Sequence, residues 1–288
     1  MAEARGQGLG FVQGDSRTVG IIGWPVEHSL SPAVHNAAFT AMSMRWIYVP
    51  LPVEPGHLGE ALVGLGALGF SGVNITMPHK TQSAELADTL SEDAKRLGAV
   101  NTFVLDAGGL HGHDTDAPGF DRFLRWDAGF DPADRSALLF GAGGAARACA
   151  LALARGGAAK LTVAVRDPER AGALLEAVDG FTTEVVVVSF ADAPSERADL
   201  IVNATPVGSA GETLPVPELN QGTLVVDLLY RPTATPLQAA ARAAGAMAFG
   251  GLGLLLHQAA LSFELWTGQQ PPLHVMSAAA LAELAEQA

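Results

Sequence analysis

The sequence predicts an α/β protein with two α/β domains, the second a Rossmann-type, doubly wound parallel sheet. Short apolar runs ending in glycine or a polar residue alternate with alanine-rich stretches of helical length across the 288 residues, the pattern of parallel strands and covering helices. One run leads into a glycine turn at residues 141–145. The length gives each domain room for its own core.

The first domain, a substrate and catalytic domain, is expected over residues 1–117, with residues 1–17 as a flexible leader that lacks an apolar segment. Ser31 and Pro32 match the start of a helix, with serine as the N-cap and proline as the first helical residue. A second helix is expected after Pro55. The expected strands cover residues 18–23, 45–51, 72–76, 99–105 and 110–113.

The cofactor domain is expected over residues 118–250. Its strands are expected at residues 137–140, 161–165, 184–188, 200–204 and 224–228, with alanine-rich helices between them. Residues 251–288 form C-terminal helices, including a long apolar helix at 252–266 that we expect to pack back on the first domain.

Composition excludes several classes of partner. A formal net charge of −13 argues against nucleic acid and anionic membranes. No uncharged apolar run reaches membrane-spanning length, and Cys149 is the single cysteine, expected to be a buried thiol. We expect a cytoplasmic protein that binds a small molecule and holds no metal; the sequence does not determine its oligomeric state and leaves a homodimer open.

The glycine turn predicts a dinucleotide site. Gly141, Ala142, Gly143, Gly144 and Ala145 stand between an apolar strand and an alanine-rich helix, where small residues let the backbone and the N–H groups of the helix start approach a pyrophosphate.

The next strand ends at Arg166 and Asp167, and Arg170 follows. Two arginines favour the 2′-phosphate of NADP, whereas Asp167 either contacts a ribose, as in NAD enzymes, or caps the helix that begins at Pro168.

Three blocks of the first domain carry reactive groups. Ser29 and Ser31 lie at a strand-to-helix junction, where hydroxyls can donate to a carboxylate. Lys80 lies just past the end of a strand, and Asp116 lies at the entrance to the cofactor domain.

Taken together, these blocks resemble the shikimate dehydrogenase family. The resemblance runs from about Gly20 to Gly268, with the motifs in family order. Its motifs are Gly23-x-Pro25-x-x-His28-Ser29-x-Ser31-Pro32-x-x-His35-Asn36, Asn74-x-Thr76-x-Pro78-x-Lys80, Gly98-Ala99-Val100-Asn101-Thr102, Thr115-Asp116, Gly141-Ala142-Gly143-Gly144-Ala145, Asn203-Ala204-Thr205-Pro206-x-Gly208, Asp227-x-x-Tyr230-x-Pro232, Thr235-Pro236-Leu237 and Gly251-x-Gly253-Leu254-Leu255-x-x-Gln258.

The resemblance implies reversible, NADP-linked reduction of 3-dehydroshikimate to shikimate, a step of aromatic amino-acid biosynthesis. It makes Lys80 and Asp116 the catalytic pair, Ser29 and Ser31 the groups for the substrate carboxylate, and Thr76, Asn101, Tyr230 and Gln258 the groups near the ring hydroxyls. It assigns the cofactor to residues 141–145, Arg166, Asp167 and Arg170, and to Thr205, Leu228 and Gly251.

Four residues depart from the family pattern. Asp114 replaces the usual asparagine. It acts either as a turn-former, as asparagine would, or as an added negative charge near the site. Val165 and Asp167 replace an asparagine and a small hydroxyl residue, which leaves NAD as an alternative cofactor, and Leu254 conservatively replaces a methionine.

Two other functions compete with this interpretation. One is an NAD-linked quinate/shikimate dehydrogenase, or a relative that acts on an amino analogue of shikimate; the intact Ser29-x-Ser31 pattern favours the biosynthetic enzyme instead. The other is a non-catalytic NADP(H)-binding sensor or regulatory protein, which would have no need for both Lys80 and Asp116.

Overall fold

The computed structural model describes residues 12–232 and 234–287, and its contacts divide the chain into two compact units. Unit 1 runs up to Thr115 and resumes at Ala259, and unit 2 runs from Asp116 to Gln258. The sequence placed these two boundaries at 117/118 and 250/251. Most of the predicted leader, residues 1–11, lies outside the described residues. Within the described part of the chain, no helix is long and apolar enough to cross a membrane.

Unit 1 is built on a mixed six-stranded sheet with the order β2-β1-β3-β5-β6-β4. Its strands are β1 Arg17–Gly23, β2 Trp46–Pro52, β3 Gly72–Ile75, β4 Thr89–Leu90, β5 Thr102–Asp106 and β6 Gly109–His113. Its helices are α1 Ser31–Ala41, α2 Leu58–Ala67, α3 Lys80–Leu86, α4 Glu92–Leu97 and α10 Leu273–Glu286, together with the second half of α9 Leu252–Thr267.

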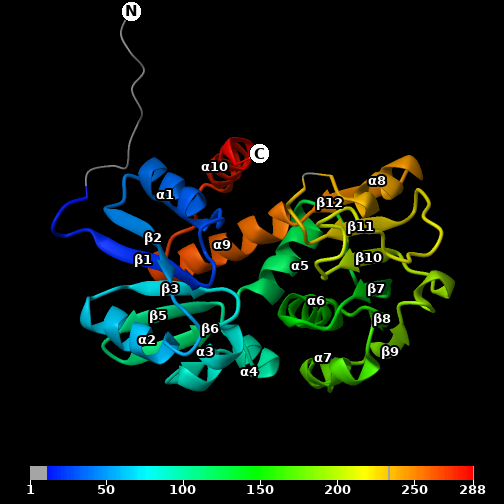
Figure 1. Ribbon diagram of the computed structural model, residues 1–288, viewed down its shortest axis with the longest axis horizontal. Coiled ribbons are helices and arrows are strands. Elements are labelled where there is room, and N and C mark those ends of the chain that lie inside the picture. The colour runs from blue at the N-terminus through cyan, green and yellow to red at the C-terminus, as the bar shows by residue number, and fades with distance from the viewer. Residues whose placement is uncertain (1–11, 233, 288) are drawn as a thin grey trace, which may run out of the picture. The chain divides into compact units, whose positions relative to one another are not determined.

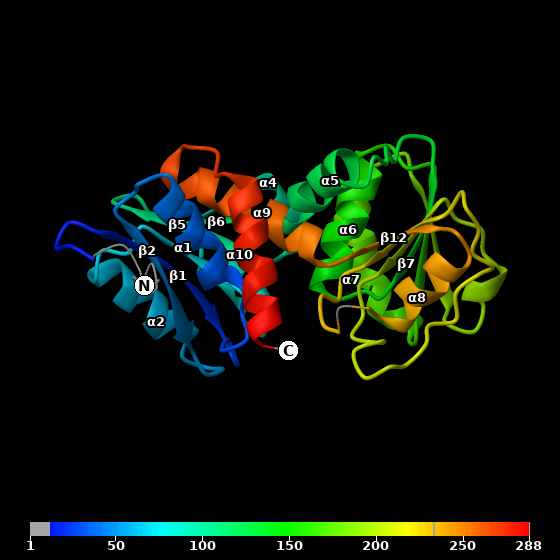
Figure 2. The ribbon, with the colours of Figure 1, turned by 90° about the horizontal axis from the view of Figure 1, so that it is seen from above.

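Two layers of helix cover this sheet. Leu58, Leu62 and Leu65 of α2 pack on Val73 and Ile75 of β3, while α1 lies on the other side of the sheet (Figure 1). Helix α10 packs along α1, and the two helices lie side by side in both views (Figure 2).

Unit 2 is a parallel six-stranded sheet with the order β12-β11-β10-β7-β8-β9, the doubly wound order of dinucleotide-binding folds. Its strands are β7 Ser136–Phe140, β8 Lys160–Val165, β9 Glu184–Ser189, β10 Leu200–Asn203, β11 Leu224–Asp227 and β12 Met247–Gly250. Its helices are α5 Asp116–Trp126, α6 Gly144–Arg155, α7 Gly172–Val178 and α8 Pro236–Ala243, with short 3-10 helices η1 Pro168–Ala171 and η2 Ala193–Ser195.

Successive side chains of the central strand β7 point to opposite faces of the sheet, so unit 2 has a hydrophobic core on each face. Leu139 of β7 faces the α5, α6 and α7 side, where Cys149 is buried, and its neighbours Leu138 and Phe140 face the α8 side. The fold class predicted from the sequence is confirmed.

Two local predictions were wrong, and strands β4 and β12 were not predicted. The strand expected at 99–105 begins only at Thr102. Strand β12 was missed because Met247-Ala-Phe-Gly250 follows an alanine-rich helix and carries no β-branched residue. Ser31 is the first residue of α1 and not its N-cap, a position that Leu30 occupies without a side-chain cap.

Candidate active site

The glycine turn lies at the carboxyl edge of the unit 2 sheet. Gly141 has a φ of +108°, a left-handed conformation that glycine adopts without strain. Gly143 is the N-cap of α6 and has no side chain to satisfy the first-turn N–H groups. A Cβ built on Gly143 would meet nothing within 4 Å, so open space faces the start of this twelve-residue helix.

A cavity of about 880 Å³ opens in front of this turn. Its walls are formed by the turn after β7, the end of β8 and the residues after it, the residue after β9, and the residues after β10. The lining residues are Gly141, Ala142, Gly143, Val165, Arg166, Asp167, Arg170, Phe190, Ala204, Thr205 and Pro206. Strands β7 and β10 are neighbours whose crossovers lead in opposite directions, and ligands of open α/β sheets bind at such a switch point.

The two arginines at this cavity are held differently. The Arg166 guanidinium lies 5.9 Å from the centre of the Phe190 ring, and Phe190 packs edge-on against Phe140 of β7. Arg170 is largely exposed, with its Nε 3.7 Å from a carboxylate oxygen of Asp167. Asp167 also accepts a hydrogen bond from the backbone N–H of Glu169 at 3.2 Å and thereby caps η1.

These residues fit an NADP molecule. An uncapped helix start with open space before it suits a pyrophosphate, and two cations at the end of β8 suit a further phosphate. NADP would lie against residues 141–145 with its 2′-phosphate toward Arg166 and Arg170. Bound there, it would supply or take up a hydride.

In unit 1, the loop after β1 carries the first pair of predicted substrate groups. The Ser29 hydroxyl accepts a hydrogen bond from the backbone N–H of Ser31, the first residue of α1, at 3.2 Å. Ser31 is buried, at 4 % exposure. Burial raises the pKa of the nearby Tyr48 phenol, an effect that a hydrogen bond with the Ser31 side chain opposes.

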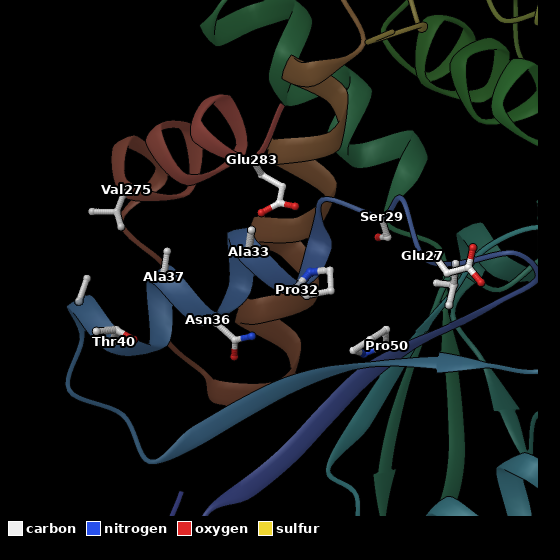
Figure 3. A pocket seen from close by; sticks show the side chains of 12 residues that line it. Glu27, Ser29, Pro32, Ala33, Asn36, Ala37, Thr40, Pro50, Val275 and Glu283 are labelled. Atoms are coloured by element: carbon white, nitrogen blue, oxygen red, sulfur yellow. The ribbon is translucent and has the colours of Figure 1, made fainter. Parts of the chain in front are cut away.

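A groove of about 740 Å³ passes beside Ser29, between the loop after β1, α1, β2 and α10 (Figure 3). Two carboxylates, Glu27 and Glu283, line it. An anionic substrate is not favoured next to two carboxylates, so we do not assign this groove to the substrate.

Thr76, Lys80 and Asn101 are brought together where β3 and β5 meet. Thr76 follows β3, and its methyl group lies where a Cβ on Gly23 would be. Lys80 is the first residue of α3, and its carbonyl accepts a hydrogen bond from Val100, next to Asn101, at 2.9 Å.

His79 fixes the backbone that carries Lys80. Its Nε2 lies 2.7 Å from the carbonyl oxygen of Val53. A carbonyl only accepts, so Nε2 donates and the neutral ring is the Nε2–H tautomer. Ser83 in turn donates to the carbonyl of His79 at 2.9 Å. The start of α3 is thus anchored to the loop after β2.

A buried amide network, which the sequence did not predict, supports the same region. Asn74 of β3 accepts a hydrogen bond from the Tyr48 hydroxyl at 2.8 Å and donates to Thr102 at 2.9 Å and to Ser262 at 3.0 Å. Ser262 lies on α9, 188 residues from Asn74, and no local pattern indicates this pairing.

The network continues to Asn101, whose Oδ1 accepts from the backbone N–H of Thr115 at 2.9 Å and from the Thr102 hydroxyl at 2.9 Å. It therefore fixes the backbone immediately before Asp116. Asp114 is also buried, at 6 % exposure.

The remaining predicted groups belong to unit 2. Asp116 is the first residue of α5 and is 9 % exposed, a position where the helix dipole stabilises a carboxylate. Gln258 lies on α9, and its backbone passes so close to Gly119 of α5 that a Cβ there would lie 2.9 Å from the Gln258 nitrogen. Tyr230 follows β11.

Family models match the chain in three segments. They are described as the shikimate dehydrogenase substrate binding domain over residues 21–103, shikimate/quinate 5-dehydrogenase over 128–215, and the shikimate 5′-dehydrogenase C-terminal domain over 251–281. The NADP⁺ shikimate dehydrogenase of Geobacter metallireducens is 43 % identical over 282 residues, covering 95 % of this chain and 99 % of the relative. The chain belongs to the shikimate dehydrogenase family.

Solved structures of this family have the same fold. Shikimate 5-dehydrogenase of Thermus thermophilus, in complex with NADP(H) and shikimate, is 37 % identical with a TM-score of 0.83, covering 93 % of this chain and 99 % of that one. Quinate dehydrogenase of Corynebacterium glutamicum, in complex with NAD, is 35 % identical with a TM-score of 0.85 and the same coverage. The family thus includes proteins named for both substrates and solved with both cofactors.

Proposed function

We propose that this protein is an NADP-dependent shikimate dehydrogenase that reversibly reduces 3-dehydroshikimate to shikimate. The observation that carries the proposal is the cavity at the end of β7, β8 and β10, where a glycine cradle and two arginines meet. Full-length similarity to NADP⁺ shikimate dehydrogenases supports the same cofactor and substrate.

We assign the proton transfer to Lys80. Hydride added to the ketone carbon leaves negative charge on the carbonyl oxygen, which needs a proton donor within hydrogen-bond reach. A lysine ammonium, with a reference pKa of about 10.4 in water, donates that proton from Nζ during reduction and takes it back during oxidation. Asp116 would favour the charged form of the lysine.

The other predicted groups would hold the substrate. Ser29 and Ser31 would donate to its carboxylate, while Thr76, Asn101, Tyr230 and Gln258 would bind its hydroxyls. The buried contacts of Asn101 and Ser31 support these roles, because a side chain already fixed by the fold loses little entropy on binding.

One observation favours NAD as a second cofactor. The Asp167 carboxylate lines the cavity beside Arg166, where it would oppose a 2′-phosphate and could accept from ribose hydroxyls. Its hydrogen bond to Glu169 and its proximity to Arg170 offset part of that charge. We therefore propose NADP as the main cofactor.

Lys80→Ala tests the enzyme against the non-catalytic sensor. Loss of a general acid–base group lowers turnover by about 10²–10⁴-fold, so the variant should lose shikimate oxidation while it still binds NADP. Lys80→Arg is the matched control because it keeps the charge but transfers a proton poorly. Full activity of both variants would contradict the assignment of Lys80.

The pH profile provides a second test. Shikimate oxidation should accelerate toward alkaline pH, because the proton acceptor must be neutral, while reduction should not. A flat oxidation profile under conditions where hydride transfer limits the rate would contradict this role for Lys80. A cytoplasmic location stays a prediction, to be checked by cell fractionation. Analytical ultracentrifugation would determine whether the protein forms the homodimer that the sequence leaves open.

A further inference from the structure

A buried carboxylate lies next to the proposed cofactor site and is not among the residues that line the cavity at the glycine turn. Asp227 is the last residue of β11 and has no exposed surface. Its Oδ1 accepts from the Asn203 side-chain amide at 3.0 Å and from the backbone N–H of Leu229 at 3.1 Å. Its Oδ2 accepts from the Thr235 hydroxyl at 2.6 Å. Asp227 therefore joins the residues that follow β10 and β11 to the start of α8.

This carboxylate is costly to bury. Burial raises the pKa of Asp227 above its ordinary value, and the hydrogen bonds from Thr235, Leu229 and Asn203 oppose that rise. A carboxylate offers acceptors at both oxygens, and here both are used. The three hydrogen bonds hold in place the chain segments to which the donors belong.

The first of these segments carries Thr205. The Asn203 amide nitrogen donates to both Asp227 and the Val207 carbonyl, at 3.0 and 2.9 Å, so its Oδ1 must face the other way. That oxygen accepts from the backbone N–H and the hydroxyl of Thr205, at 3.0 and 2.7 Å. Because its hydroxyl is held in this way, Thr205 points its methyl group toward Gly141. A Cβ built on Gly141 would lie 3.0 Å from that methyl carbon. Asp227 thus sets, through Asn203, the wall that faces the glycine turn.

The second segment carries Leu228 and leads to Gly251. Leu229 donates to Asp227 and accepts, through its carbonyl, from the backbone N–H of Gly251 at 3.1 Å. Gly251 lies so close to the Leu228 carbonyl that a Cβ would overlap it. The position of Gly251 at the start of α9 therefore depends on the backbone that Asp227 holds.

We propose that Asp227 is a positioning residue for the dinucleotide: its buried carboxylate holds Thr205, Leu228 and Gly251 in place for the part of the cofactor away from the arginines. This inference rests on the proposed function, since it takes NADP as the ligand. It predicts that loss of the carboxylate weakens the binding of the whole dinucleotide but not of its 2′-phosphoadenosine end, which Arg166 and Arg170 would hold.

The test compares dissociation constants for NADP and for adenosine 2′-monophosphate, a fragment with neither the pyrophosphate nor the nicotinamide half, by isothermal titration calorimetry. Asp227→Ala should raise the NADP dissociation constant about tenfold, the effect of losing one or two hydrogen bonds, and should change the fragment constant less than twofold. Thr235→Val is the matched control because it removes a donor to the same carboxylate on the α8 side only, and it should leave both constants within about twofold.

Asp227→Asn should restore most of the NADP affinity, because its oxygen can still accept from Asn203 and Leu229 while its amide donates to Thr235. If Asp227→Ala does not fold, Asn203→Ala cuts the Thr205 segment alone and should weaken NADP binding in the same selective way. Equal weakening of NADP and the fragment, or unchanged NADP affinity, would overturn the proposal. A wild-type protein that binds NADP but does not oxidise shikimate would contradict the proposed function and leave this inference standing.

Discussion

His35 should make the stability of unit 1 depend on pH in a way that a single substitution removes. The side chain lies on α1 with no exposed surface, stacked on Tyr48 at 4.5 Å and 5.3 Å from the Trp266 ring. Neither ring nitrogen has a hydrogen-bond partner among the described residues. Burial lowers the pKa of His35 from 6.5 to about 3, because a charged imidazolium would lose its hydration.

The sign and size of the effect follow from linkage. Below pH 6.5 the unfolded chain binds a proton at His35 that the folded chain does not bind until about pH 3, so this contribution to stability is complete above pH 6.5 and is lost as the pH falls. At pH 5 the solution is about 1.5 pH units below the His35 pKa of the unfolded chain, whereas at pH 8 it is above that pKa. At about 1.36 kcal/mol per unit, the free energy of unfolding therefore falls by about 2 kcal/mol between pH 8 and pH 5.

The assay is urea unfolding followed by tryptophan fluorescence at pH 8 and pH 5. His35→Phe removes the titrating ring but keeps an aromatic side chain, so it should lose about 2 kcal/mol less than the wild type over this interval. Phe39→Leu, in the same aromatic cluster, should lower stability at both pH values and keep the wild-type slope. Equal slopes for the wild type and His35→Phe, or an NMR titration of His35 near pH 6.5, would show that burial does not keep the His35 ring neutral.

Two further substitutions test other parts of the account. Gly72→Ala should destabilise the protein by about 3 kcal/mol in urea unfolding. The new Cβ would overlap the Trp266 indole and lie 2.6 Å from the Phe103 carbonyl oxygen, which accepts a hydrogen bond from that indole. A loss below about 0.5 kcal/mol would contradict this packing. Arg166→Ala should raise the KM for NADP roughly 30-fold, the equivalent of about 2 kcal/mol for a charge-assisted contact. The KM for NAD should stay nearly unchanged. Equal changes for both cofactors would show that Arg166 does not recognise the 2′-phosphate.

The sequence predicted best those elements whose signal is local. The strands of unit 2 that lie inside the sheet are continuous apolar runs, as at Leu224–Asp227, because both of their faces are covered. The glycine turn was readable for the same reason, since its conformation and its neighbours are fixed within a few residues. Strand β12 lies at a sheet edge and carries no such run.

The supporting contacts of the site were not predictable from one sequence. Asn74, Ser262 and Tyr48 meet only because β3, α9 and β2 pack together, and a polar residue in an apolar segment does not indicate its partner. His35 belonged to a recognised motif, yet only its burial between aromatic rings shows that it is a neutral side chain. Ser31 was misassigned as the N-cap because α1 begins one residue earlier than the pattern of Ser31 and Pro32 indicates, with Leu30 as the N-cap.

The most direct test of the central claim is the initial rate of cofactor reduction by the purified protein with shikimate or quinate, each with NADP or NAD. An NADP-dependent shikimate dehydrogenase should show the highest kcat/KM for shikimate with NADP, a lower value for shikimate with NAD, and weak activity with quinate. Preference for quinate with NAD would assign the chain to the other substrate of its family, and no activity with any of the four pairs would contradict the account.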